Sequence, residues 1–440
     1  MTSDPVVLVA YQCGPGMGSV SQIGWEWFSR LALRRPVSLV THVRNRAAIE
    51  AAGPLPAGSE IIYINTEWLA RPLYALARRL FPRSEHSVFL ISQLDFFAFD
   101  RMALRALRRH RAMARWRLLH LVTPVTLSAP SCLHRLGLPL VRGPLNCGLG
   151  DPPGFAKALR QESGWMCRLR GITKALDRLL GASAQAAMLL VATRATAEAV
   201  APAHRVRCVP MLENAVDLAR FPAAPPLPLP IGGYPLHVTF VGRLVPVKGL
   251  DLLLRAMQRL RMAGQPVRLT VVGDGPMRQP WQALAAQLGI GPDVYFTGNL
   301  EPQAVAESMR QCHVFCLPSV RESGGAVLLE AMACARPVIA MDFGGPAEIV
   351  NHEVGRLVRF DNAASAIDGL TQALSDCLSA PRTWAARGAL AHARVAAHHT
   401  WDAKIDLAER LYAQVLAGNE ALDGQGPAQP GIAEVTNVEG

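Results

Sequence analysis

The stretch that decides the fold is Pro318–Ala333, which reads PSVRESGGAVLLEAMA. An apolar run ends at Pro318, and a pair of glycines precedes a helical stretch, which is typical of a strand that turns tightly into a helix. The free backbone N–H groups and the dipole at such a helix start form an anion site. The stretch therefore predicts an α/β fold with an anion-binding turn over Ser323, Gly324 and Gly325.

Two carboxylates belong to the same stretch. Glu322 lies just before the predicted helix, and Glu330 lies inside it, within the apolar sequence AVLLEAMACA. A buried carboxylate usually has a partner, so a site role for Glu330 is favoured over a surface role. Carboxylates in nucleotide sites accept hydrogen bonds from ribose hydroxyls, and a second acid can face the hydroxyls of a sugar.

A turn with two cations precedes this stretch in the chain. Residues 240–249 read FVGRLVPVKG, so a strand ends at Gly242 and is followed by Arg243 and Lys248. Ligands of open α/β sheets bind at the carboxyl ends of strands, and an Arg fork with a Lys point charge suits a diphosphate. The alternative is a surface loop with two solvated cations. Residues 271–276, VVGDGP, repeat the strand–turn–helix pattern around Asp274.

The same rhythm of strands and helices extends over both halves of the chain, which predicts two domains with parallel sheets. In the second half the predicted strands are 237–242, 268–273, 294–298, 314–318 and 337–341, and the predicted helices are 250–262, 277–288, 302–311 and 325–334. In the first half the predicted strands are 6–11, 37–43, 61–65, 118–122, 186–192 and 206–209. The proline-rich residues 221–235 are interpreted as a linker, because Pro neither continues a helix nor donates to a sheet.

Two features of the first half are open between a structural and a functional reading. The turn GPGMG, with Gly16 and Gly18, follows the first predicted strand. It departs from a dinucleotide fingerprint because the third glycine comes one residue early and the expected acid is missing. His120 stands near a strand end, where it is either a buried core residue or part of a site.

The turns named above, in their order and spacing, resemble family 4 of the glycosyltransferases. Glu322 and Glu330 resemble its EX7E signature, and residues 213–217, ENAVD, resemble the segment that joins its two domains. The resemblance is specific over about 210–360 and loose over 1–200. This sequence departs from the pattern at Gly324, where Phe is common, and at Ala335, where Gly is common, which leaves the identity of the donor sugar open.

The resemblance implies two facing Rossmann-like domains, the GT-B fold. We expect an acceptor-binding domain over 1–212, a nucleotide-sugar-binding domain over 213–399, a crossover helix over 400–417 that packs on the first domain, and a disordered tail over 418–440.

The resemblance also implies retaining transfer of a hexose-type sugar from a nucleotide-diphosphate sugar to a hydroxyl acceptor, with no cofactor and no metal. The sequence contains no Asp-x-Asp. The implied catalytic residues are Glu322, His120, Arg243 and Lys248. The implied donor-binding residues are Gly16, Gly18, Gly242, Arg243, Lys248, Asp274, Ser323, Gly324, Gly325 and Glu330. A nucleotide-sugar epimerase of the same fold and a catalytically silent binding subunit are the alternatives.

Composition constrains the surroundings of the protein. Residues 1–200 carry 25 Lys and Arg against 12 Asp and Glu, and seven of the arginines lie between Arg101 and Arg117. Such a stretch is either a solvated helix face or a surface for an anionic membrane and its lipid-linked acceptors; no nucleic-acid partner is expected. Nine scattered cysteines suggest free thiols in a reducing, cytoplasmic compartment. No run reaches the ~18–20 apolar residues of a membrane span.

Overall fold

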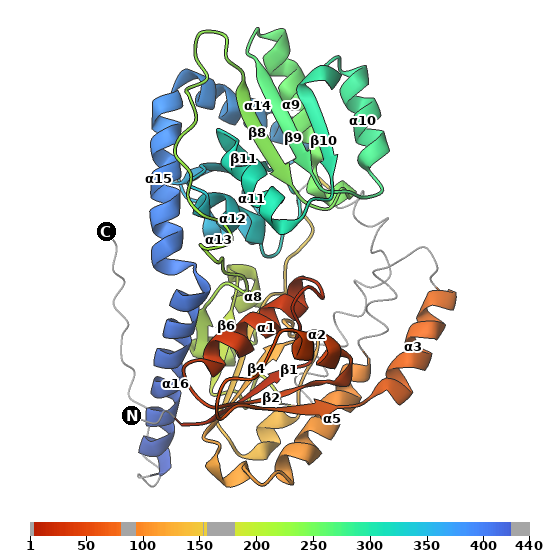
Figure 1. Cartoon of the computed structure of the whole chain (residues 1–440), viewed down its shortest axis with the longest axis vertical. Helices are drawn as coiled ribbons and strands as arrows, with labels where there is room; N and C mark the ends of the chain where they lie inside the picture. Colours follow the sequence, from red (N-terminus) through yellow and green to blue (C-terminus); the bar gives the residue numbers. More distant parts are fainter. Residues whose placement is uncertain (1–3, 81–93, 153, 156–180, 424–440) are drawn as a thin grey trace.

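The computed structural model describes residues 4–80, 94–152, 154–155 and 181–423. These residues form two α/β domains that lie one above the other in Figure 1. Each domain is built on a sheet whose strands pair in parallel throughout the described residues, with helices around it. The predicted fold class is confirmed.

The first domain has a seven-stranded sheet within the described residues, in the order β3-β2-β1-β4-β5-β6-β7. Its central strands are buried along their whole length, as expected for strands covered on both faces. The strands are β1 Val6–Ala10, β2 Val37–His42, β3 Glu60–Ile64, β4 Leu118–Thr123, β5 Leu140–Leu145, β6 Met188–Val191 and β7 Cys208–Pro210. The helices are α1 Ser19–Ala32, α2 Arg46–Ala51, α3 Glu67–Leu80, α5 Asp95–Arg108 and α8 Arg194–Ala199.

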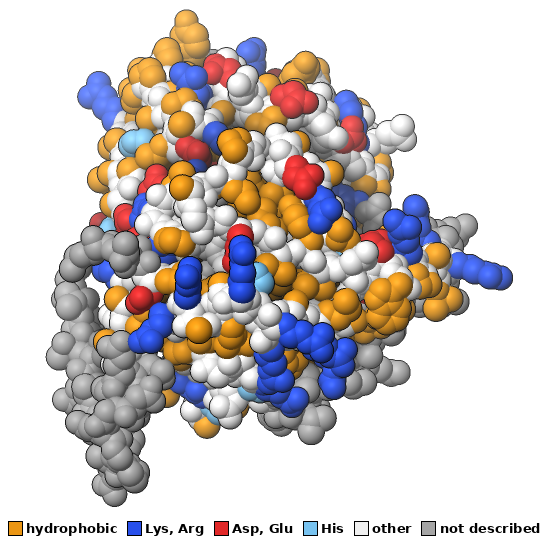
Figure 2. All heavy atoms as spheres, turned by 60° about the horizontal axis from the view of Figure 1, so that its bottom comes forward, with side chains coloured by type: hydrophobic (Ala, Val, Ile, Leu, Met, Phe, Trp, Pro, Cys, Tyr) orange, Lys and Arg blue, Asp and Glu red, His pale blue; other side chains and the backbone are white. Residues whose placement is uncertain are grey.

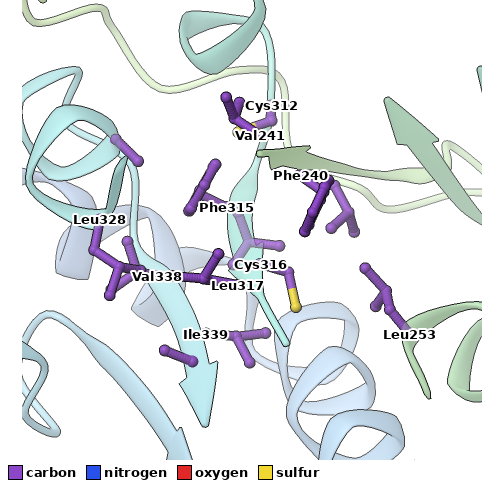
Figure 3. Packing of buried hydrophobic residues seen from close by; sticks show 14 of the residues in the cluster. Phe240, Val241, Leu253, Cys312, Phe315, Cys316, Leu317, Leu328, Val338 and Ile339 are labelled. Carbon is purple, nitrogen blue, oxygen red and sulfur yellow. The ribbon is translucent and has the colours of Figure 1, made fainter. Parts of the chain in front are cut away.

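The second domain has a six-stranded sheet in the order β10-β9-β8-β11-β12-β13. Figure 3 shows its core, where Phe240, Phe315 and Ile339 come from three neighbouring strands. The strands are β8 Leu236–Val241, β9 Val267–Val272, β10 Val294–Gly298, β11 Val314–Leu317, β12 Val338–Met341 and β13 Gly355–Val358. The helices are α9 Leu250–Met262, α10 Arg278–Gln287, α11 Pro302–Arg310, α12 Ala326–Ala333, α13 Pro346–Ile349, α14 Ala363–Ser379 and α15 Pro381–His398.

The strand order changes direction at one place in each sheet. In the second domain the change lies between β8 and β11, which are hydrogen-bonded neighbours. Ligands of open α/β sheets bind in the crevice that such a change leaves at the carboxyl ends of the strands. The turn with Arg243 and Lys248 leaves β8, and the turn with Glu322 leaves β11. Both predicted turns therefore begin at this change of strand order.

The chain crosses between the domains twice. After the second domain it returns as α16, Trp401–Asp423, which packs against α1 and buries Ile405 and Tyr412 in the core of the first domain (Figure 1). The two crossings touch, because Val216 N donates to His399 O at 2.9 Å and Trp401 N donates to Val216 O at 3.2 Å. The predicted crossover helix packs as expected, but it continues to Asp423, so residues 418–423 of the predicted tail are helical. Residues 424–440 lie outside the described residues.

The interpretation of residues 221–235 as a linker is wrong. Arg336 Nη2 donates to Pro225 O at 2.8 Å, and Ala224 N donates to Cys334 O at 3.3 Å, so this stretch is fastened to the second domain. Its prolines avoid helix and sheet hydrogen bonds but still allow an extended segment to pack on a domain. The crossing lies earlier, between β7 and Val216.

The arginines of the basic stretch are all exposed, on α5 and the loop that follows it. Figure 2, with the bottom of Figure 1 turned forward, shows Lys and Arg side chains gathered below the centre of this face. None of the helices in the described ranges is both long and apolar enough to cross a membrane. The eight cysteines within those ranges are free thiols.

Candidate functional site

A hollow of about 530 Å³ lies at the carboxyl ends of β8, β9 and β10. Three successive turns form its wall, each of which begins where a strand ends. The lining residues are Val241, Gly242, Arg243, Val272, Gly273, Asp274, Gly275, Asn299, Leu300 and Val305. The predicted residues Gly242, Arg243 and Asp274 are thus brought together in one hollow.

Two glycines allow the first two turns to touch. Gly273 has φ +125° and Gly275 has φ +156°, a range that L side chains rarely adopt. A Cβ on Gly273 would lie 2.1 Å from Gly242 O, and one on Gly275 would lie 2.5 Å from Leu244 O. The turns are further joined because Leu244 N donates to Asp274 O at 2.9 Å. Glycine is therefore required here to keep the wall of the hollow closed.

Asp274 is committed to its own turn. Its carboxylate accepts from Gly275 N at 2.7 Å and from Arg278 Nη1 at 2.7 Å. These two donors hold the pKa of Asp274 below its usual value, so it is an anion. Asp274 lines the hollow, but its hydrogen bonds show that it orders the turn as well.

Lys248 and Glu322 form an ion pair between the turn that follows β8 and the turn that follows β11. Lys248 Nζ lies 2.5 Å from Glu322 Oε2, and both side chains are largely buried, at 20% and 15% exposure. The turns are also joined through their backbones, since Val320 N donates to Val247 O at 3.0 Å. Two residues 74 positions apart, each predicted for the site, therefore form one ion pair.

The turn from Glu322 to Gly325 leads directly into α12. Gly325 is the N-cap residue of this helix and has φ +65°. No side chain forms a capping hydrogen bond at this position. Gly325 N donates a hydrogen bond to Glu322 Oε1 at 3.4 Å. Behind the turn, Gly345 N donates to Glu322 O at 2.9 Å, and a Cβ on Gly345 would lie 2.4 Å from Ser323 O. The turn is thus held from behind. At the start of α12 the N–H groups of Gly325 and Leu328 are bonded within the turn, whereas for those of Ala326 and Val327 the described residues supply no partner, so these two can bind a ligand.

Glu330 lies on α12 and is half-buried. Among the described residues no donor forms a hydrogen bond with its carboxylate, and Arg220 is the cation that acts on it. Burial raises the pKa of Glu330 to about 7, and the charge of Arg220 lowers it by less. An acid with unused acceptor capacity, placed in the apolar helix α12 that follows the Glu322–Gly325 turn, fits a residue that binds ligand hydroxyls.

The structure places His120 away from these residues. It stands in the middle of β4, is fully buried, and uses both ring nitrogens inside the first domain. Nε2 lies 2.7 Å from Gly143 O, which can only accept, so Nε2 carries the proton and Nδ1 accepts from the Tyr412 hydroxyl at 2.6 Å. Burial lowers the pKa of His120 to about 4. The expectation that His120 lines the site is therefore corrected: it is a core residue.

Gly16 and Gly18 lie in the turn between β1 and α1, at the change of strand order in the first sheet. Their φ angles are +72° and +102°, and nothing lies within 4 Å of where a Cβ would stand. Gly16 N donates to Gln22 Oε1 at 3.2 Å, a contact within the first domain. The backbone of this turn is open on one side, and its predicted role toward the donor stays a prediction.

Two residues that were not among the predicted site residues also contact the Glu322–Gly325 turn. Asn146, just after β5, donates from Nδ2 to Ser323 O at 2.9 Å, so the first domain holds the turn of the second. Glu213 is 8% exposed and packs against Gly324. Glu213 was visible within the ENAVD segment, but no spacing rule connects it with a turn more than 100 residues away.

Comparison with known proteins agrees with this geometry. Residues 229–389 match the family described as glycosyl transferases group 1, which confirms the resemblance for the second domain. The chain is 35% identical over 159 residues to a GDP-mannose-dependent phosphatidylinositol monomannoside mannosyltransferase of Mycolicibacterium smegmatis, covering 34% of this chain and 41% of that protein. It is 41% identical over 148 residues to a D-inositol 3-phosphate glycosyltransferase of Rhodococcus erythropolis, covering 31% and 33%. The matches thus span less than half the length of these curated relatives.

Solved structures with the same fold cover nearly the whole chain. Sucrose-phosphate synthase from Thermosynechococcus elongatus superposes with a TM-score of 0.61 at 18% identity, covering 94% of this chain and all of that one. HepE of Anabaena, solved in complex with UDP, gives a TM-score of 0.59 at 16% identity, covering 93% and 100%. These likenesses confirm the GT-B arrangement of two domains.

Proposed function

We propose that the protein is a retaining glycosyltransferase that moves a hexose-type sugar from a nucleotide-diphosphate sugar to a hydroxyl acceptor. The observation that carries the proposal is the Lys248–Glu322 pair, which lies at the change of strand order, next to the turn that begins α12 and near a hollow at the neighbouring strand ends. The family match of the second domain supports the same reaction class.

The negative charge of the donor diphosphate would be neutralised by Arg243 and Lys248, and its oxygens would accept hydrogen bonds from backbone N–H groups at the start of α12. Glu330 would accept hydrogen bonds from the ribose hydroxyls, and Asp274 with its glycines would shape the hollow around the nucleoside. Glu322 would face the donor sugar and keep Lys248 in place. Bond cleavage puts negative charge on the leaving phosphate, so these cations and N–H groups supply the main catalytic stabilisation.

The reaction would need no covalent enzyme intermediate. In a front-side displacement the acceptor hydroxyl attacks the anomeric carbon on the face that the diphosphate leaves, and the leaving phosphate oxygen takes the acceptor proton. His120 has no part in this scheme, because both of its nitrogens are bonded within the core.

We propose that transfer proceeds without a metal ion, with Arg243 and Lys248 as the charge compensation. A donor-dependent rate that is unchanged by EDTA and by added Mg²⁺ would support this. A rate that falls after chelation and returns with Mg²⁺ would contradict it.

The acceptor is proposed to be a glycan or a lipid-linked saccharide at an anionic membrane surface on the cytoplasmic side. The exposed arginines of α5 and the loop that follows it support this proposal, since such a cluster attracts acidic head groups. A small aglycone is the soluble alternative.

The proposal is tested by thermal shift with UDP-, GDP-, ADP- and dTDP-sugars. A ligand that binds only the native state raises the unfolding temperature with concentration. A shift with one nucleotide class that is lost in Glu330→Ala would support the donor site, and no shift with any of them would favour a silent subunit. Analysis of the donor after incubation without acceptor separates an epimerase, which would alter the sugar.

A further inference from the structure

The space where a side chain of residue 324 would stand is filled by two side chains from residues 211–216, the segment in which the chain crosses to the second domain (the crossing segment). A Cβ on Gly324 would lie 2.3 Å from Glu213 Oε1 and 2.5 Å from Asn214 Nδ2. Real Cβ atoms do not approach other atoms this closely, so any larger residue at 324 would displace Glu213 or Asn214. Asn214 is partly exposed and its amide can turn aside, whereas Glu213 is buried.

The backbone around Glu213 is fixed from the other side by α16. Lys404 is 6% exposed, and its Nζ donates to Leu212 O at 2.5 Å and to Asn214 O at 2.7 Å. These carbonyls belong to the two neighbours of Glu213 in the chain. The backbone on both sides of Glu213 is therefore fixed by Lys404 of α16, which limits how far the Glu213 side chain can move from the turn.

The carboxylate of Glu213 also has electrostatic contact with the site. Burial raises its pKa, Glu322 raises it further, and Asn146 and Lys404 lower it. Asn146 in turn donates to Ser323 O at 2.9 Å. Glu213 on the crossing segment and Asn146 in the loop after β5 thus both contact the turn, while α16 holds the backbone beside Glu213.

We propose that Glu213 is a positioning residue for the Glu322–Gly325 turn and that, through Gly324, it determines how tightly the sugar part of the donor is held. The inference rests on the proposed function, because it assigns the turn to the donor sugar. Gly324 has no side chain of its own to anchor the turn, so the contact with Glu213 replaces that anchor. A turn displaced by about 1 Å can cost a large factor in productive binding.

The experiment measures binding, so that no acceptor is needed. The probes are UDP-glucose and UDP, and GDP-mannose and GDP, titrated calorimetrically into the full-length protein. For Glu213→Ala we expect the affinity for the sugar nucleotide that binds wild type to fall about tenfold, and that for its nucleoside diphosphate to fall less than about threefold. Glu330→Ala is the matched control, because loss of a ribose contact should weaken both probes by the same factor.

Two further variants separate positioning from folding. Glu213→Gln keeps the shape and an acceptor oxygen, so it should bind the sugar nucleotide within about threefold of wild type. Gly324→Ala alone should lower the affinity for the sugar nucleotide about as much as Glu213→Ala does. The double variant should be no weaker than either single variant, because the new methyl group occupies the space that the acid leaves.

The outcomes are distinct. The positioning role is overturned if a folded Glu213→Ala protein binds the sugar nucleotide as wild type does, or if its affinities for both probes fall equally. It is also overturned if the affinity losses of the two single variants multiply in the double variant. If wild type binds neither UDP-glucose nor GDP-mannose, the titrations are repeated with an ADP-sugar and a dTDP-sugar. If none of the four binds, the proposed function fails and this inference with it.

Discussion

The Tyr412 hydroxyl lies 2.6 Å from Nδ1 of His120, so the last described helix of the chain is bonded to the middle of the first sheet. Both side chains are fully buried, and Trp27 packs edge-on against the His120 ring with centroids 4.7 Å apart. The Tyr412→Phe variant leaves a buried nitrogen without its donor. We expect it to lower the free energy of unfolding by about 1–3 kcal/mol, measured by urea denaturation.

Tyr295→Phe is the matched control for that variant. Tyr295 is 68% exposed, so its hydroxyl bonds to water in both states and stability should change by less than about 0.5 kcal/mol. Equal stability of Tyr412→Phe and wild type would contradict a structural role for the His120–Tyr412 bond. Donor binding should be the same in all three proteins.

Removal of the Lys248 charge should affect turnover more than folding. In Lys248→Met the leaving diphosphate loses one of its proposed cations, and Glu322 loses its partner at 2.5 Å. We expect the transfer rate to fall by about a hundredfold or more, measured with saturating donor. Arg268→Met, which removes an exposed arginine on β9, is the control and should transfer at the wild-type rate. A Lys248→Met enzyme that is as fast as wild type would remove Lys248 from the mechanism.

Glu330 should make stability depend on pH. Its pKa is raised by burial from 4.5 in the unfolded chain to about 7 in the folded protein, so the folded state holds a proton that the unfolded state has released. The stabilisation is complete below pH 4.5 and is lost as the pH rises to about 7. The melting temperature of wild type minus that of Glu330→Gln should therefore fall across this interval. A constant difference would show that Glu330 ionises normally.

Binding to anionic membranes should depend on the arginines of α5 and of the loop that follows it. We expect the protein to sediment with phosphatidylglycerol-containing vesicles at low salt and to be released at high salt, because the attraction is screened. The triple variant Arg101→Ala, Arg105→Ala, Arg109→Ala should lose this binding. The double variant Arg268→Ala, Arg382→Ala, with changes on the second domain, should keep it. Sedimentation that is indifferent to salt and to both sets of changes would exclude this surface.

The second domain could be predicted closely from its sequence because its strands are short apolar runs that end at glycine turns. The predicted residues 294–298 are the bounds of β10, and the helix predicted over 250–262 is α9. Strand β5 was missed because it reads LVRGPL, and a charge, a glycine and a proline are typical of a loop. Arg142 is nevertheless buried there, since it donates to Ala129 O at 2.9 Å and to Ser183 Oγ at 3.0 Å.

The site was predictable as a set of turns but not as a set of contacts. Glycine spacing indicated where Lys248 and Glu322 would stand, whereas their ion pair depends on β8 and β11 being neighbours in the sheet. His120 was misassigned because a histidine near a strand end looks the same in sequence whether its ring faces a ligand or a helix. The partner that decides the matter, Tyr412, lies 292 positions away.

The contact between Val216 and Thr400 has a consequence for how such proteins can be recombined. The residues between Val216 and Thr400 are therefore an insertion in the chain of the first domain. The core of that domain is complete only when α16 packs on it. A graft that replaces the second domain with that of a relative must therefore be joined at both residues, but the two joints lie side by side. A foreign insert needs to match only one short spacing between its ends, which makes this pair of joints suitable for exchanging the second domain while the first domain stays intact.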